Sequence, residues 1–201
     1  PGSGTGTNAS IRMLEYASGV VGSGSTDVGA TQCSASADPS GPFQIVPVPT
    51  ALSGAPVPVP GSVELHRTSV FKTGTPVFVE VIDANANADP AVRETVLVTL
   101  VNDTGDAETL RLLETSADSS AFAGYVDSVS APAVAHDCSI SGGLHVTLTA
   151  DYVDASDATD RAEARAMVDA GGGSIVNVSS IAGALTHPWM SAYCASKAGL
   201  D

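Results

Sequence analysis

Apolar and polar residues alternate along several short runs of this chain. From Leu144 to Tyr152 every second residue is apolar or aromatic, and the residues between them are His, Thr, Thr and Asp. Because successive side chains of a β-strand point to opposite faces, this run predicts a strand with one buried face. The same pattern predicts further strands at residues 11–16, 63–71, 76–82, 94–101, 108–115 and 121–126.

Turn-forming residues separate the predicted strands. Gly74, Gly105 and the pair Gly142-Gly143 each lie in a short polar segment between two runs, and glycine supplies backbone conformations that tight turns need. Short strands joined by such turns predict an all-β fold, an antiparallel immunoglobulin-like β-sandwich. We expect it to span residues 11–160, with the best definition over 63–157. The single tryptophan, Trp189, lies outside this region, so the prediction concerns the architecture only.

The two ends of the chain lack this pattern. Residues 1–10 are rich in Gly, Ser and Thr and predict a flexible leading segment. Residues 161–201 form a C-terminal extension to which the alternation assigns no fold. Prolines recur between residues 47 and 60, which favours polyproline or an edge strand over a central strand.

Charge narrows the possible partners. The chain carries 22 acidic and 8 basic residues, a net charge of −14. A protein that binds nucleic acids or anionic membranes needs clustered Lys and Arg, so we expect neither as a partner. No apolar run is long enough to insert into a membrane, and the start at Pro1 leads us to expect a processed or excised product.

Two of the three cysteines, Cys33 and Cys138, lie in the sandwich-like region, and Cys194 lies in the tail. A disulfide between the first two would close a loop of about 105 residues and contribute on the order of 4 kcal/mol in the chain-entropy model. It would also indicate an oxidising compartment, and hence a secreted or cell-surface protein. Two unpaired buried thiols remain the alternative.

Five segments follow one another in a distinctive order in the middle of the chain, at residues 74–90, 94–100, 105–115, 121–126 and 151–157. In this order they resemble repeat modules of large bacterial surface and extracellular proteins. It implies a non-catalytic structural or adhesive role, as in stalks, surface layers and filaments. It also implies self-association or contact with neighbouring repeats, and no cofactor other than calcium.

A run of oxygen-bearing side chains follows the predicted strand 76–82. Asp83, Asn85, Asn87, Asp89 and Glu94 stand at positions 1, 3, 5, 7 and 12 of this run. Ca²⁺ takes about six to eight oxygen ligands, and alternate spacing lets several of them converge. The run therefore predicts a calcium site that is similar to an EF-hand loop.

The run also departs from that pattern, because Ala88 replaces the usual turn glycine and the flanks are strands. Turn capping without a metal is the alternative. Two further acidic groups could add ligands at other turns: Asp103, Asp106 and Glu108, and then Asp151, Asp154, Asp157 and Asp160.

The tail contains a different pattern. Ser180 ends an apolar run, and Tyr193 and Lys197 are one helical turn apart. A lysine so placed can lower the pKa of the tyrosine, which could then exchange a proton with a substrate bound by the serine. The Asn-Val-Ser-Ser and Tyr-x-Ala-Ser-Lys motifs are similar to short-chain dehydrogenases/reductases. This resemblance implies that Ser180 orients the substrate, Tyr193 is the acid/base, and Lys197 binds the nicotinamide ribose.

Other parts of that family's pattern are missing. No glycine-rich turn opens an apolar helix, as a dinucleotide site requires, and no alternating strand–helix pattern precedes the tail. Residues 157–169 have helix-like composition but could equally continue the last strand of the sandwich. The sequence therefore favours a non-catalytic surface protein, with an NAD(P)-dependent short-chain dehydrogenase/reductase fragment using Ser180, Tyr193 and Lys197 as the alternative.

Overall fold

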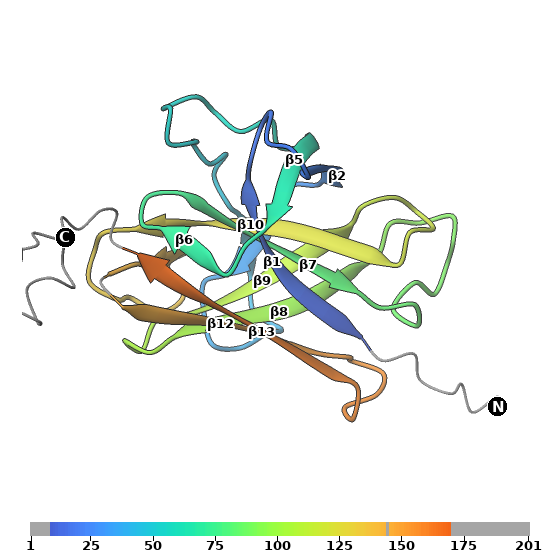
Figure 1. Ribbon diagram of the computed structural model, residues 1–201. Coiled ribbons are helices and arrows are strands. Elements are labelled where there is room, and N and C mark those ends of the chain that lie inside the picture. Colours follow the sequence, from blue (N-terminus) through green and yellow to red (C-terminus); the bar gives the residue numbers. More distant parts are fainter. Residues whose placement is uncertain (1–8, 144, 170–201) are drawn as a thin grey trace, which may run out of the picture. The chain divides into compact units, whose positions relative to one another are not determined.

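The computed structural model describes residues 9–143 and 145–169, and this part of the chain contains strands and no helix (Figure 1). The all-β prediction is confirmed. The described residues form thirteen strands. These are β1 (Ser10–Tyr16), β2 (Gly24–Val28), β3 (Gln32–Ser34), β4 (Phe43–Ile45), β5 (Gly61–Arg67), β6 (Val70–Lys72), β7 (Pro76–Ile82), β8 (Thr95–Asn102), β9 (Ala107–Glu114), β10 (Ala121–Val129), β11 (Ser139–Ser141), β12 (Val146–Val153) and β13 (Arg161–Asp169).

The strands form one mixed sheet in the order β2-β5-β1-β7-β10-β9-β8-β12-β13-β6. Most neighbours are antiparallel, but β11 pairs in parallel with β10, and β6 pairs in parallel with β13. The expectation of a purely antiparallel fold is therefore wrong. Both exceptions are strands of three residues that run alongside the end of a longer strand, where no hairpin imposes an antiparallel direction.

The sheet curls so that β1 lies against β13, although the two share no ladder. At one end the backbone N–H of Ala9 donates to Asp160 Oδ1 at 2.8 Å. At the other end the segment before β6 lies between the strands: Thr68 N donates to the carbonyl of Met13, and Met167 N donates to the carbonyl of Ser69. The chain therefore runs in the same direction along β1 and β13.

Strand β7 is buried on both faces. Val77, Val79 and Val81 point to one side, Phe78 and Glu80 point to the other, and all five are nearly inaccessible to water. The segment between β2 and β5 covers the second side. Its Thr31 hydroxyl accepts the backbone N–H of Tyr125 at 2.9 Å, and its Val46 carbonyl accepts the hydroxyl of Tyr125, whose ring lies 5.9 Å from that of Phe78. Burial of both faces explains why residues 76–82 read as a nearly continuous hydrophobic run.

Residues 161–169, whose structure the sequence left open, form a strand. Strand β13 pairs with β12 along its length, from Val168 opposite Val146 to Arg161 opposite Val153. Ala166 and Val168 are buried, and Met167 between them is half exposed. That alternation is the pattern of a strand at the edge of a core, and it excludes a helix at these positions.

In the part of the chain that the structure describes, no helix has the length and hydrophobicity that crossing a membrane requires. Ser180, Tyr193 and Lys197, the three residues of the dehydrogenase-like motif, lie outside the described residues.

Candidate metal centre

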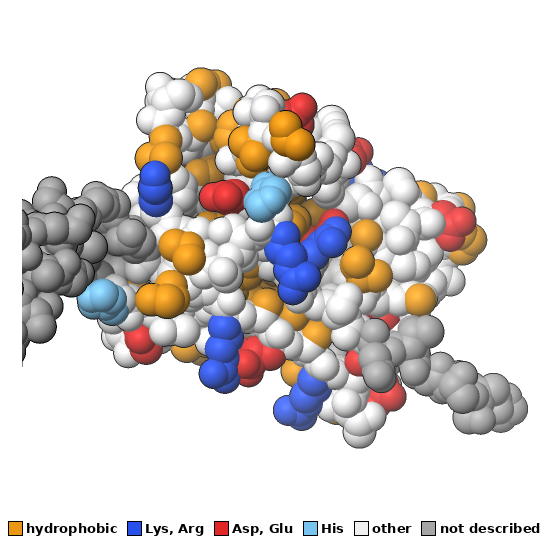
Figure 2. Space-filling view, in the orientation of Figure 1, with side chains coloured by type: hydrophobic (Ala, Val, Ile, Leu, Met, Phe, Trp, Pro, Cys, Tyr) orange, Lys and Arg blue, Asp and Glu red, His pale blue; other side chains and the backbone are white. Residues whose placement is uncertain are grey.

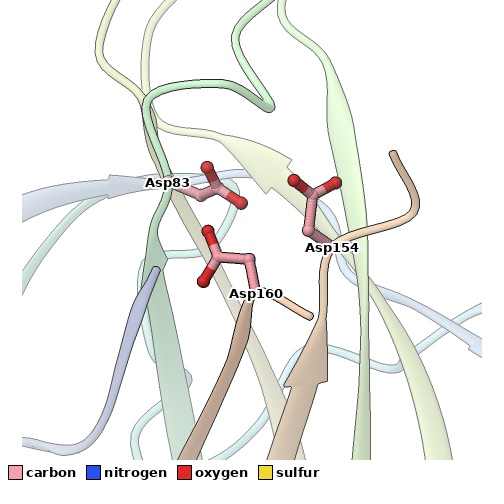
Figure 3. Close-up of side chains that lie close together, drawn as sticks. All are labelled: Asp83, Asp154 and Asp160. Atoms are coloured by element: carbon pink, nitrogen blue, oxygen red, sulfur yellow. The ribbon is translucent and has the colours of Figure 1, made fainter. Parts of the chain in front are cut away.

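Three buried aspartates meet at one end of the sheet (Figure 3). Asp83, Asp154 and Asp160 each place one carboxylate oxygen within 4.8 Å of the others. Their exposed fractions are 1%, 4% and 9%. A group of buried carboxylates this close is the strongest candidate for a ligand site among the described residues.

The ends of three long strands position these side chains. Asp83 directly follows β7, Asp154 directly follows β12, and Asp160 directly precedes β13. Strands β12 and β13 form a hairpin, and across it the backbone N–H of Asp154 donates to the carbonyl of Asp160 at 3.0 Å. Strand β1 brings the end of β7 to this hairpin, because Ser10 pairs with Ile82 while Ala9 binds Asp160.

Donors from the protein orient two of the three carboxylates. The Tyr152 hydroxyl donates to Asp83 Oδ2 at 2.6 Å, and Asn85 N donates to Asp83 Oδ1 at 3.1 Å. Asp154 accepts hydrogen bonds from the backbone N–H and hydroxyl of Ser156 and from the side-chain amide of Asn85. Both oxygens of each carboxylate are therefore engaged.

Asp160 is different. Its Oδ1 accepts the N–H of Ala9, but its Oδ2 is buried and has no hydrogen-bond partner. Figure 3 shows the carboxylate of Asp160 next to that of Asp83, and one of its oxygens lies within 4.8 Å of an oxygen of each of the other two aspartates. Buried polar atoms in native proteins nearly always have a partner, so an orphaned carboxylate oxygen calls for an explanation.

Within residues 9–143 and 145–169, no basic side chain pairs with these carboxylates. None of the ion pairs formed by the described residues includes Asp83, Asp154 or Asp160. Burial raises the pKa of Tyr152, and its hydrogen bond to Asp83 and the charges of the three aspartates raise it further. Tyr152 therefore stays protonated and serves as a donor. Chemically, the cluster can hold a hard cation or share a proton.

The structure distributes the five residues of the predicted calcium loop over several roles. Asp83 belongs to the cluster, and Asn85 supports it through Asp154. Asn87 instead donates to Asp118, whereas Asp89 accepts the N–H of Ala91. Glu94 Oε1 accepts the backbone N–H groups of Ala88 and Asp89, which closes its own loop. The five side chains thus do not converge on one point.

The members of the two other acidic groups also take different roles. Asp106 and Glu108 are buried, and the Glu108 carboxylate accepts the N–H groups of Asp137 and Cys138 at 3.0 Å each. Burial raises the pKa of Glu108 to about 7. Asp157 caps its own turn through Thr159. Of the group between residues 151 and 160, only Asp154 and Asp160 reach the cluster.

Cys33 and Cys138 are placed as a disulfide, with Cα atoms 5.7 Å apart. Cys33 lies in β3, and Cys138 directly precedes β11. The bond joins the segment between β2 and β5 to the connection between β10 and β11. The sequence identified this pair but not the cluster partners of Asp83.

A signal for those partners was present in the chain. Asp83 and Asp154 each directly follow a predicted strand, and Tyr152 lies two residues before Asp154 on the buried face. The pattern could not show that the ends of β7 and β12 meet, because their meeting depends on the curl of the sheet.

Comparison with known proteins concerns the end of the chain. A family model for the short chain dehydrogenase family matches residues 158–201. The match supports the partial resemblance of the tail, and its first residues include all of β13, which pairs within the sheet. A search of curated proteins finds no match.

Proposed function

We propose that this chain is a non-catalytic structural or adhesive module of an extracellular or cell-surface protein, built as an immunoglobulin-like β-sandwich. The observation that carries the proposal is the Cys33–Cys138 pair, which joins two distant parts of an all-β framework. Disulfides persist in oxidising compartments, outside the cytosol. The net charge of −14 and the repeat-like order of segments agree with a surface module.

We further propose that the module associates with copies of itself or with neighbouring repeats through β2. Strand β2 stands at one end of the strand order and pairs only with β5 among the described residues. Val20 and Val21 precede it and are 50% and 97% exposed. Figure 2 shows hydrophobic side chains exposed at the top of the view, where Figure 1 places β2 and β5. An unpaired strand edge is a template for another strand.

Light scattering and sedimentation over a range of protein concentrations test this proposal. The protein should associate, and Val21→Lys should weaken association roughly ten-fold, because lysine beside an edge strand opposes strand addition. Val134→Lys is the matched control, since Val134 is also an exposed valine in a loop. A monomer at every concentration argues against self-association, and free thiols in protein secreted from an oxidising host argue against the extracellular assignment.

The dehydrogenase alternative rests on the family match over residues 158–201. In that proposal Ser180, Tyr193 and Lys197 act on a substrate with a nicotinamide cofactor, and another chain supplies the nucleotide-binding half. Titration with NADH and NADPH distinguishes the two functions, because a bound nicotinamide changes its fluorescence. No change at any cofactor concentration favours the structural module.

A further inference from the structure

We infer that Asp83, Asp154 and Asp160 bind a divalent cation, Ca²⁺ in the first place, and that this ion fastens the start of β1 to the β12–β13 hairpin. The inference concerns these residues and does not depend on where the protein is located.

Charge gives the first argument. Three buried carboxylates each place an oxygen within 4.8 Å of the others, and no ion pair of the described residues includes them. Burial of unpaired charge is strongly unfavourable, so such groups pair, bind a metal or take up a proton. A divalent cation neutralises two of the three charges in one step.

The orphaned oxygen gives a second, independent argument. Oδ2 of Asp160 is buried without a partner, while Oδ1 of the same carboxylate is satisfied by Ala9. A surface aspartate would turn to water, but Asp160 is only 9% exposed and lies beside Asp83 within the cluster. A ligand bound within the cluster would give this buried oxygen the partner that it lacks.

The spacing fits Ca²⁺. Two oxygens on opposite sides of a Ca²⁺ ion, each at about 2.3–2.6 Å, lie about 4.6–5.2 Å apart. The three carboxylate oxygens lie within 4.8 Å of one another, so every pair fits inside one shell. The shell of Mg²⁺ is narrower, with opposite oxygens about 4.2 Å apart. Water would complete the coordination, and the Tyr152 hydroxyl would hold Asp83 in place from behind the metal.

The role of the ion follows from the second contact of Asp160. This carboxylate belongs to the cluster, and its Oδ1 also accepts the N–H of Ala9, directly before β1. An ion that fixes Asp160 therefore also fixes the start of β1 against β13. The same ion joins the end of β7 to the hairpin through Asp83 and Asp154.

Thermal unfolding of the full chain tests the inference. After treatment with EDTA, added Ca²⁺ should raise the unfolding midpoint, and the rise should grow with concentration as mass action requires. Asp160→Asn should lose most of this rise and bind Ca²⁺ at least roughly ten-fold more weakly. Asp157→Asn, in the same turn and with the same charge change, should respond as the unsubstituted protein does.

Terbium luminescence gives a second measurement that does not depend on the stability of a variant. Tb³⁺ bound at the cluster should be sensitised by Tyr152, whose hydroxyl contacts Asp83, and Ca²⁺ should displace it. Tyr152→Phe should keep the binding but alter the excitation spectrum. The inference is overturned if Ca²⁺ acts no differently from NaCl at equal ionic strength, or if Asp160→Asn retains the full response. It is also overturned if, without Ca²⁺, lowering the pH raises the unfolding midpoint of the unsubstituted protein more than that of Asp160→Asn, because then a proton balances the charges of the cluster.

Discussion

At the scale of single residues, Glu108 shows how a buried charge can shape a loop. Its side chain is fully buried, and its two oxygens accept the backbone N–H groups of Asp137 and Cys138. His136 and Cys138 both have positive φ, at 64° and 70°, a conformation that L-residues rarely adopt. The carboxylate thus stabilises a strained turn next to the disulfide, but burial opposes its charged form.

This opposition predicts a dependence of stability on pH. The pKa of Glu108 rises from 4.5 to about 7 in the folded protein, with burial as the main cause. Between these values the unfolded chain releases a proton that the folded protein retains, so the free energy of unfolding falls as pH rises. The loss attributable to Glu108 is at most about 3 kcal/mol.

Urea unfolding across this pH range measures the effect. In Glu108→Gln the free energy of unfolding should change less between pH 4.5 and 7, because an amide does not titrate. Glu163→Gln, at an exposed position of β13, should leave the slope as it is. An unchanged slope in Glu108→Gln would show that other groups cause the pH dependence.

At the scale of elements, alternation predicted the long strands well and the short ones poorly. Residues 76–82 were predicted without error as β7, and the predicted strands 94–101 and 108–115 are displaced by one residue from β8 and β9. Strands β2 and β3 are short and polar, so their pattern contains too little hydrophobic signal. They are strands because their neighbours, β5 and β9, offer hydrogen bonds.

Strand β13 and the aspartate cluster were hard to predict for the same reason, because both depend on contacts with other parts of the chain. Residues 161–169 are rich in Ala, Arg and Glu, which favour a helix locally, yet the open edge of β12 turns them into a strand. Similarly, Asp83 was a predicted ligand, but its partners Asp154 and Asp160 are about 70 residues away in the sequence. They meet because the sheet curls, which brings the end of β7 and the start of β1 to the β12–β13 hairpin.

Paired substitutions in β13 test the strand directly. Val168→Asp should destabilise the protein by about 3 kcal/mol or more, since Val168 is 1% exposed and an unpaired carboxylate would be buried. Met167→Asp should cost less than about 1 kcal/mol, because Met167 is 51% exposed. Urea unfolding of both variants distinguishes a strand from a helix, and equal costs would contradict the strand.

At the scale of the whole molecule, the disulfide adds to a core built mostly of aliphatic residues. Aromatic residues make up 4% of the chain, and the buried cluster consists mostly of Val, Leu and Ala. The Cys33–Cys138 bond spans a sequence separation of 105. A cross-link over so long a loop limits the freedom of the unfolded chain.

The double substitution Cys33→Ser with Cys138→Ser should therefore lower the free energy of unfolding by about 2–4 kcal/mol. Urea unfolding of the oxidised protein and of the variant measures this difference. A reducing agent should destabilise the unsubstituted protein by a similar amount and leave the variant unaffected. If the reducing agent has no effect on the unsubstituted protein, the two cysteines do not form a bond in solution.

The parallel course of β1 and β13 has a mechanical consequence. Ala9 lies beside Asp160, at the start of β13, whereas Asp169 lies nine residues further along the same strand, about 30 Å away. Tension between these two points would act along both strands and load the contacts at Ala9, Met13 and Met167 in shear. These contacts would bear the load at the same time, whereas in unzipping they would break one after another. If modules were connected at these two positions, they would form an extended chain. Each copy would then resist stretching through the contacts between β1 and β13.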